Sequence, residues 1–223
     1  MLIEYKNVKV SHDDGEEVLN GIDFKASAGE FIYIIGKVGS GKSSFLRTIY
    51  GELEIDEADK AQVFDYDMMK IRHKEIQQLR RELGIIFQDF KLLTDRSVSK
   101  NLEFVLKATG WKKSEDIGKR IKEVLHTVKM DGVEDKMPHE LSGGEQQRIA
   151  IARSLLNSPK VILADEPTGN LDPDTAEQII GLFRDCSATG TAVIITTHNM
   201  SLLEKFPGIV YECVDGKMIV HNA

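Results

Sequence analysis

The residues best suited to chemistry lie in a glycine-rich segment, Gly36–Ser43, which matches the pattern G-x-x-x-x-G-K-[ST]. The glycines let successive backbone N–H groups curl around an anion, and a helix opening near Lys42 adds the positive end of its dipole. We expect Lys42 to reach the β- and γ-phosphates of a nucleotide and the Ser43 hydroxyl to ligate Mg²⁺. The segment predicts nucleotide binding by Gly36, Lys37, Val38, Gly39, Ser40, Gly41, Lys42, Ser43 and Ser44.

Two adjacent carboxylates, Asp165 and Glu166, follow the apolar run Val161–Ala164. In open α/β folds, ligands bind at the carboxyl edge of the sheet, which is where such a strand delivers its next residues. There Asp165 can hold hydrated Mg²⁺, and Glu166 can orient and deprotonate an attacking water. Paired acids at a strand end are often only a solvated turn, but the phosphate-binding pattern upstream favours the catalytic interpretation.

A second potential anion site is the segment Ser142–Gly144, which precedes a helical pattern. Ser142 is a good N-cap residue, and the two glycines leave the first N–H groups of the helix accessible. One chain rarely needs two sites for one γ-phosphate, so we expect this helix end to serve the nucleotide of a partner subunit. An ordinary capped helix is the alternative, and these three residues alone do not exclude it.

Short apolar runs along the chain predict the strands that would position these motifs. Solidly apolar runs are typical of strands buried on both faces, and their alternation with helices predicts a mostly parallel sheet covered by helices, an α/β fold. Two stretches that alternate polar and apolar residues, joined by turn residues at 12–15, predict an antiparallel pair at the start. The expected elements are strands at Leu2–Val10, Val18–Ala26, Phe31–Ile35, Ile85–Phe87, Val161–Ala164 and Ala192–Thr196, and a helix at Lys42–Tyr50.

The middle of the chain has only helical patterns. One of them places Ile117, Ile121, Leu125 and Val128 on a single face, with Lys and Glu between them. We therefore expect one domain, 1–223, with a nucleotide-binding core formed by 1–96 and 159–223. An inserted helical subdomain, 97–158, would end in the helix that follows Ser142.

Taken together, the segments GKVGSGKS, VILADE and LSGGEQQR resemble the motif set of ATP-binding-cassette ATPases over nearly the whole chain. The resemblance implies a P-loop NTPase (RecA-like) core that hydrolyses ATP with Mg²⁺. It also implies an N-terminal antiparallel β-subdomain and an inserted α-helical subdomain. It further implies a head-to-tail dimer of two copies, with two ATP molecules between the phosphate loop of one copy and the signature, Ser142–Gly144, of the other.

The same resemblance implies roles for three further positions. Gln88, after the strand Ile85–Phe87, is similar to the family's Q-loop glutamine, which contacts Mg²⁺ and senses the membrane subunit. The segment Gly169–Asp172 is similar to the D-loop, which crosses to the other subunit, and Asp172 is included in the site. His198 resembles the switch histidine that contacts the γ-phosphate. Glu166, His198 and Gln88 form the expected catalytic set.

One position departs from the family pattern. The family usually stacks an aromatic residue on adenine, in the loop between the first two strands, and counting back from Val18 places His12 there. The imidazole ring of His12 stacks over a smaller area than the ring of Tyr or Trp. His12 therefore does not by itself imply tight ATP binding or selectivity for adenine. His12 and Val18 are assigned to the base side of the nucleotide site.

The run Gln88–Val98, QDFKLLTDRSV, resembles the cell-division branch of the family. That resemblance implies an integral membrane partner that controls peptidoglycan hydrolases, with its coupling helix docked on Gln88–Val98. It also implies a peripheral location on the cytoplasmic face of the inner (plasma) membrane. Lipoprotein-release and macrolide-export ATPases share the run at 166–172, so an ATPase subunit of a transporter remains the alternative.

The composition is that of a globular protein with no nucleic-acid partner. The chain has 223 residues, of which 41% are hydrophobic and 29% charged, with 29 Lys and Arg against 36 Asp and Glu. This excess of acidic residues argues against a protein whose main role is to bind the phosphates of nucleic acids. No apolar run approaches the ~18 residues of a membrane span, and the start does not resemble a secretion signal. Cys186 and Cys213 have no metal spacing.

Two other classes are disfavoured by the same sequence. DNA-repair and chromosome-structuring cassette ATPases carry long coiled-coil or zinc insertions, whereas this chain has no sustained heptads. A nucleotide-binding module without hydrolysis would not need Glu166, Gln88 and His198, all of which are present.

Overall fold

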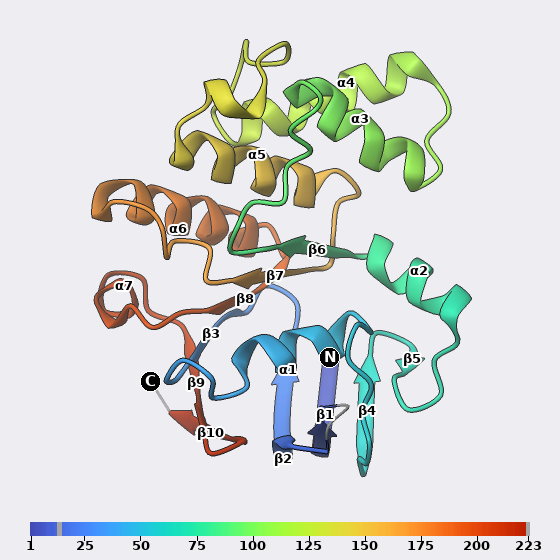
Figure 1. The fold of residues 1–223 in the computed structure, drawn as a ribbon, viewed down its shortest axis with the longest axis vertical. Coiled ribbons are helices and arrows are strands. Elements are labelled where there is room, and N and C mark those ends of the chain that lie inside the picture. The colour runs from blue at the N-terminus through green and yellow to red at the C-terminus, as the bar shows by residue number, and fades with distance from the viewer. Residues whose placement is uncertain (13–14, 222–223) are drawn as a thin grey trace.

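The structure, a computed structural model, describes residues 1–12 and 15–221 and contains two sheets (Figure 1). A six-stranded sheet has the order β10-β9-β3-β8-β7-β6, and a four-stranded sheet has the order β2-β1-β4-β5. The strands are β1 Ile3–Ser11, β2 Glu17–Ala26, β3 Phe31–Ile35, β4 Lys60–Val63, β5 Tyr66–Asp67, β6 Leu83–Ile86, β7 Val161–Asp165, β8 Ala192–Thr196, β9 Ile209–Val214 and β10 Lys217–His221.

The larger sheet is parallel except for β10, which pairs antiparallel with β9. Its central strands β3, β7 and β8 are apolar except for the last residues of β7 and β8, Asp165 and Thr196, because each of their faces packs on a separate core. In β3, for example, Phe31 and Tyr33 face one core, while Ile32 and Ile34 face the other. The predicted, mostly parallel sheet is therefore confirmed.

The smaller sheet is antiparallel and covers the first helix of the chain. β1 pairs with β2 from Ile3↔Ala26 to Ser11↔Glu17, which confirms the predicted antiparallel pair. The predicted turn at 12–15 lies partly outside the described residues, because 13 and 14 are not described. α1 buries Phe45, Leu46 and Ile49 in the core shared by the two sheets.

Helices cover the other face of the larger sheet: α6 and α5 pack on it, α5 against β6, and α3 and α4 lie beyond α5 (Figure 1). The predicted apolar face at Ile117, Ile121, Leu125 and Val128 is buried, and Val128 is the residue at which α4 ends. No helix formed by the described residues is long and apolar enough to span a membrane. The helices are α1 Lys42–Ile49, α2 His73–Arg81, α3 Val98–Ala108, α4 Ser114–Thr127, α5 Gly143–Leu155, α6 Pro173–Ala188 and α7 Met200–Lys205, with a 3₁₀ turn at Pro138–Glu140.

One strand prediction needs correction. The strand expected at Ile85–Phe87 is β6, Leu83–Ile86. The first two residues of β6 were missed because Gly84 interrupts the apolar run. Its missing side chain is what the packing requires: a Cβ there would lie 2.9 Å from the backbone oxygen of Ser154 in α5. The strands β4, β5, β9 and β10 and the helix α2 are further elements that the apolar-run criterion did not predict.

Candidate active site

The carboxyl ends of four parallel strands, β3, β8, β7 and β6, meet at one edge of the larger sheet. Pairing puts Thr196 at the end of β8 beside Ile34 on one side and Asp165 on the other. The starts of α1, α5 and α7 point to this same side, on the left of Figure 1. The topology therefore gathers the residues that follow each strand, which include most of the predicted site.

The glycine-rich loop after β3 has a backbone that only glycine tolerates at two points. Gly36 has φ 142°, and a Cβ on it would lie 2.4 Å from the backbone oxygen of Cys213. Gly41 has φ 98° and precedes α1, to which it gives no side-chain cap. Because no side chain caps α1, its first N–H groups are left for an anion, as anion binding at a helix start requires.

Lys42 is nearly buried, and its ammonium group is held by the loop itself. Its Nζ atom donates to the backbone oxygen of Gly36 at 2.9 Å and to that of Lys37 at 2.8 Å. Both acceptors are neutral carbonyls, so a phosphate oxygen would be a stronger partner for this cation. The ammonium group is therefore pre-positioned beside the phosphate site.

The loop fits a phosphate group in a further respect. The Ser40 Oγ atom is buried and has no hydrogen-bond partner among the described residues. An orphaned hydroxyl in a loop of accessible N–H groups is a donor available to an anion. Ser43 and Ser44 follow in the first turn of α1, both half-buried, and Val38 and Gly39 are exposed at the tip.

Asp165 connects this loop to the end of β7. Its Oδ1 atom accepts a hydrogen bond from the Ser43 hydroxyl at 3.0 Å and another from the Thr196 hydroxyl at 2.6 Å. Hydroxyl and carboxylate oxygens are the hard donors that Mg²⁺ prefers. Ser43 and Asp165 would hold such an ion, which would neutralise phosphate charge when bound. Gln88, the third predicted ligand, is exposed in the turn after β6 at the same sheet edge.

Glu166 has an unusual backbone, with φ 43°. For a residue other than glycine this conformation is strained and needs support from its surroundings. Its N–H group donates to Thr196 Oγ1 at 2.9 Å, and its Oε2 atom lies 3.0 Å from Nδ1 of His198. The Thr196 hydroxyl thus positions both acidic residues: it donates a hydrogen bond to the Asp165 carboxylate and accepts one from the Glu166 N–H group.

The predicted signature forms a capping box at the start of α5. The Glu145 carboxylate accepts hydrogen bonds from the backbone N–H and the hydroxyl of Ser142, each at 2.8 Å. In return, Ser142 Oγ accepts from the Glu145 N–H at 3.3 Å. The bonds from Ser142 lower the pKa of Glu145 below its ordinary value of 4.5.

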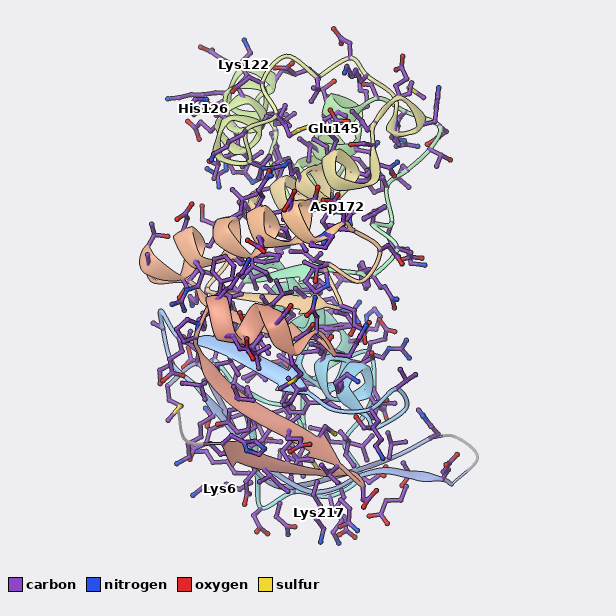
Figure 2. All side chains as sticks on the ribbon, turned by 90° about the vertical axis from the view of Figure 1, so that its left-hand side faces the viewer. Lys6, Lys122, His126, Glu145, Asp172 and Lys217 are labelled. Carbon is purple, nitrogen blue, oxygen red and sulfur yellow. The ribbon has the colours of Figure 1, made fainter. Side chains whose placement is uncertain are left out.

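Asp172 caps the next helix with a single side-chain hydrogen bond rather than a capping box. Its carboxylate accepts from the Thr175 N–H at 3.0 Å at the start of α6, and hydrogen bonding to Thr175 lowers its pKa. Figure 2 shows Glu145 and Asp172 at the starts of their helices. Contact distances place α5 directly against α6 here, because a Cβ on Gly144 would lie 2.6 Å from Thr175 Cγ2. Within one copy, the signature therefore lies beside the predicted D-loop.

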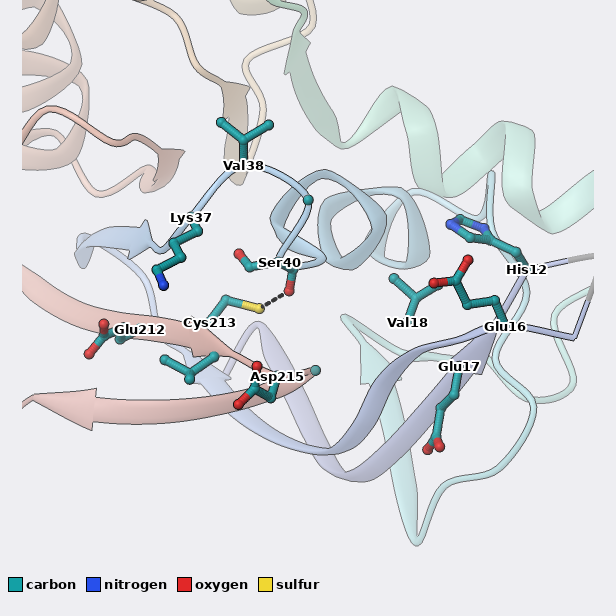
Figure 3. Close-up of a pocket in the computed structure, with 13 residues that line it drawn as sticks. His12, Glu16, Glu17, Val18, Lys37, Val38, Ser40, Glu212, Cys213 and Asp215 are labelled. Carbon is teal, nitrogen blue, oxygen red and sulfur yellow. Dashed lines mark hydrogen bonds between the residues drawn. The ribbon is translucent and has the colours of Figure 1, made fainter.

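A cavity of about 690 Å³ opens between the phosphate loop and the antiparallel strands. Figure 3 shows His12 and Val18 on its β1–β2 side and Lys37 and Ser40 on the loop. The residues Glu212–Gly216, at the end of β9 and in the turn after it, complete the lining and were not predicted. The cavity therefore brings the phosphate loop together with His12 and Val18, the residues predicted to border the base.

Besides the cavity residues Glu212–Gly216, sequence reasoning missed three residues that shape the site. Glu145 could have been found, because Ser142-x-x-Glu145 is a capping-box pattern. Thr196 carried a weaker signal as the polar end of an apolar strand. Arg153 gave none: its guanidinium group donates to the backbone oxygens of Phe90 and Lys91, so it ties the end of α5 to the predicted docking segment.

Comparison with known proteins agrees with this geometry. Residues 19–169 match the ABC transporter family. The chain is 39% identical to the cell division ATP-binding protein FtsE of Streptococcus pneumoniae, covering 98% of this chain and 94% of that protein. It is 40% identical to FtsE of Bacillus subtilis, with coverage of 98% and 95%, and 37% identical to FtsE of Escherichia coli, with coverage of 92% and 91%.

Solved structures give the same result. The dimeric post-hydrolysis state of the ATP-binding cassette MJ0796 bound to ADP and Pi is 30% identical, with a TM-score of 0.88 and coverage of 99% and 98%. A second dimeric structure of MJ0796, described as a bacterial ABC transporter cassette, is 32% identical, with a TM-score of 0.85 and coverage of 97% and 96%. The chain therefore belongs to the ABC transporter family, as an FtsE-like ABC ATPase.

Proposed function

We propose that two copies of this chain close head to tail around two ATP molecules and that each site hydrolyses its ATP with Glu166 as the general base. The observation that carries the proposal is the cluster at the sheet edge, where Ser43, Asp165, Thr196, Glu166 and His198 are joined by contacts of 2.6–3.0 Å. The reported dimers of MJ0796 support the closed arrangement.

In this mechanism, Glu166 orients a water and takes its proton as the water oxygen attacks the γ-phosphorus and the bond to ADP breaks. His198 fixes the Glu166 carboxylate and contacts the γ-phosphate. Lys42 exchanges its two carbonyl partners for phosphate oxygens, and Ser43, Asp165 and Gln88 would hold Mg²⁺, which would neutralise phosphate charge. His12 and Val18 border the base, with the limited stacking area of an imidazole.

The signature Ser142–Gly144 and the D-loop residue Asp172 complete the site of the other copy. ATP bridges the two copies in the closed state and not in the open state, so it shifts the equilibrium towards closure. Hydrolysis removes the bridge and resets the dimer. We include in the proposal that the helical segment 97–158 moves as a unit against the core formed by 1–96 and 159–223.

The relatives named FtsE suggest that this cycle serves cell division. The partner we propose is an integral membrane subunit resembling FtsX, which docks near Gln88–Val98 and regulates peptidoglycan hydrolases. The chain would then lie at the cytoplasmic face of the inner membrane. Asn101 supports the docking role, because its side-chain Nδ2 atom donates to the backbone oxygens of Leu93, Arg96 and Ser97 and holds this segment in shape.

The experiment is an affinity pull-down of the Glu166→Gln chain from native membranes with ATP, followed by mass spectrometry. We expect a four-span membrane protein with a large extracytoplasmic loop, tied to cell-wall hydrolases. Adding Leu93→Glu, a change on the docking segment, is expected to abolish its recovery. Recovery of a lipoprotein-release complex or a solute or drug permease would contradict the division role and leave the ATPase chemistry in place.

A further inference from the structure

Gln147 on α5 is a fully buried amide without a hydrogen bond. Its exposed fraction is 0%, and neither its Oε1 nor its Nε2 atom has a partner among the described residues. Burying an amide without partners costs free energy, because the hydrogen bonds it makes to water in the unfolded chain are lost. Buried polar side chains in native proteins are usually paired, so this one requires an explanation.

Asn101 shows what a satisfied buried amide looks like in the same molecule. It is 2% exposed, its Nδ2 atom donates to three backbone oxygens, and its Oδ1 atom accepts from the Leu93 N–H at 2.7 Å. On α5 itself, the neighbouring Gln146 donates to the Leu141 backbone oxygen at 3.1 Å. The isolation of Gln147 is therefore a property of its own position.

That position is one helical turn from the start of the signature helix. Residues three and four apart share a helix face, so Gln147 lies on the face of Gly143 and Gly144. Side chains on a helix lean towards its N-terminus, which carries the amide over these two glycines. Their surroundings are known: a Cβ on Gly143 would lie 3.8 Å from Leu171 Cδ2, and one on Gly144 would lie 2.6 Å from Thr175 Cγ2.

Thr175 lies in the first turn of α6, and Leu171 belongs to the segment that leads from Glu166 to α6. Its turn is held by two hydrogen bonds, from the Gly169 N–H to the Glu166 oxygen at 3.1 Å and from the Leu171 N–H to the Thr168 oxygen at 3.2 Å. A movement of this segment against α5 would bring backbone N–H and C=O groups within reach of the Gln147 amide. The same movement would adjust Glu166 at the other end of the segment.

We infer that Gln147 is a positioning residue that pairs with the backbone of segment 168–172 when two copies close on ATP. The inference rests on the proposed function. In the open monomer the buried amide is unpaired, which raises the free energy of that state. In the closed dimer it is paired, and this difference favours closure and sets Glu166 for hydrolysis.

The test compares Gln147→Met with Asn101→Leu, each of which replaces a buried amide by an apolar side chain of similar size. Without nucleotide, we expect Gln147→Met to raise the melting temperature by about 2–4 °C and Asn101→Leu to lower it. In the Glu166→Gln background, we expect Gln147→Met to weaken ATP-dependent dimerisation roughly tenfold. In the otherwise unchanged chain, Gln147→Met should lower kcat more than it changes KM for ATP.

Several outcomes would overturn the inference. If Gln147→Met lowers the melting temperature, as Asn101→Leu is expected to do, the Gln147 amide only stabilises the fold and the inference is wrong. If the Glu166→Gln parent dimerises with ATP and its Gln147→Met derivative dimerises equally well, the positioning role fails and the proposed function stands. If the Glu166→Gln parent binds ATP and stays monomeric, the proposed function fails and this inference fails with it.

Discussion

The Nδ1 atom of His198 lies 3.0 Å from the Oε2 atom of Glu166. This contact joins the residues that follow two neighbouring parallel strands, β8 and β7, and it leaves the His198 side chain 59% exposed while that of Glu166 is 16% exposed. The imidazole therefore covers the carboxylate from the solvent side. A general base, the role we propose for Glu166, must be held in one orientation to act on a bound water, and this contact would provide that orientation.

Replacing His198 tests the contact directly. We expect His198→Ala to lower ATP turnover about a hundredfold, because the freed carboxylate loses its orientation, with little change in ATP binding. His126→Ala is the matched control: His126 is an exposed histidine at the end of α4, with its imidazole 3.2 Å from the Asp131 carboxylate. Steady-state ATPase assays of both variants decide the matter, and equal rates for the two would contradict the role of His198.

Lys42 is expected to govern ATP affinity. Lys42→Ala removes the ammonium group that donates to the backbone oxygens of Gly36 and Lys37 in the phosphate loop. We expect the Kd for ATP to rise about 10- to 100-fold, the scale of a charged hydrogen bond. Isothermal titration calorimetry measures this, with Lys60→Ala, whose ammonium pairs with Glu4 on the smaller sheet, as the control. An unchanged Kd for Lys42→Ala would contradict the phosphate-loop assignment.

Asp165→Asn separates metal binding from structure. The amide oxygen of asparagine can still accept from Ser43 and Thr196, so the melting temperature should stay nearly unchanged. Loss of the carboxylate charge should raise the Mg²⁺ concentration needed for half-maximal ATPase activity at least about tenfold. A Mg²⁺ titration of wild-type protein and variant checks this, and coincident titration curves would remove Asp165 from the metal site.

The capping box on α5 predicts a pH dependence. Hydrogen bonds from Ser142 lower the pKa of Glu145 below 4.5, so its ionised form stabilises the folded state. Because the pKa of Glu145 is lower in the folded than in the unfolded state, its contribution to the free energy of unfolding is complete above its pKa in the unfolded state. That contribution is lost as the pH falls through its pKa in the folded state. The stability difference between wild-type protein and Glu145→Gln should therefore be larger at about pH 7 than at about pH 4. Urea unfolding at the two values measures it, and a difference that grows in acid would contradict the capping role.

The central strands could be predicted from the sequence because β3, β7 and β8 are buried on both faces and read as unbroken apolar runs. The strands β9 and β10 gave no such signal, because the sheet edge leaves them partly exposed. β4 and β5 are short and alternate in burial. β4 depends on pairing with β1, a long-range contact that no local pattern records, and β5 in turn pairs with β4.

The site divides in a similar way. The phosphate loop, Asp165, Glu166 and His198 follow apolar strands, and the structure brings them to one sheet edge, while their roles stay predictions. The double role of Thr196 could not be predicted, because it requires knowing that β8 lies beside β7 in a register that pairs Thr196 with Asp165. The isolation of Gln147 could not be predicted either, because the segment LSGGEQQR does not show which of its side chains are buried without a hydrogen-bond partner.

The most direct test of ATP-driven closure is the mass in solution of the Glu166→Gln chain, by light scattering, with ATP and Mg²⁺ or with ADP and Mg²⁺. Glutamine keeps the size of the side chain and removes the base, so hydrolysis should fall about 10²- to 10⁴-fold while ATP binding persists. We predict that the mass doubles from 25.0 kDa with ATP and stays at that value with ADP. A variant that binds ATP and remains at the mass of one chain, or one that retains wild-type turnover, would contradict the account.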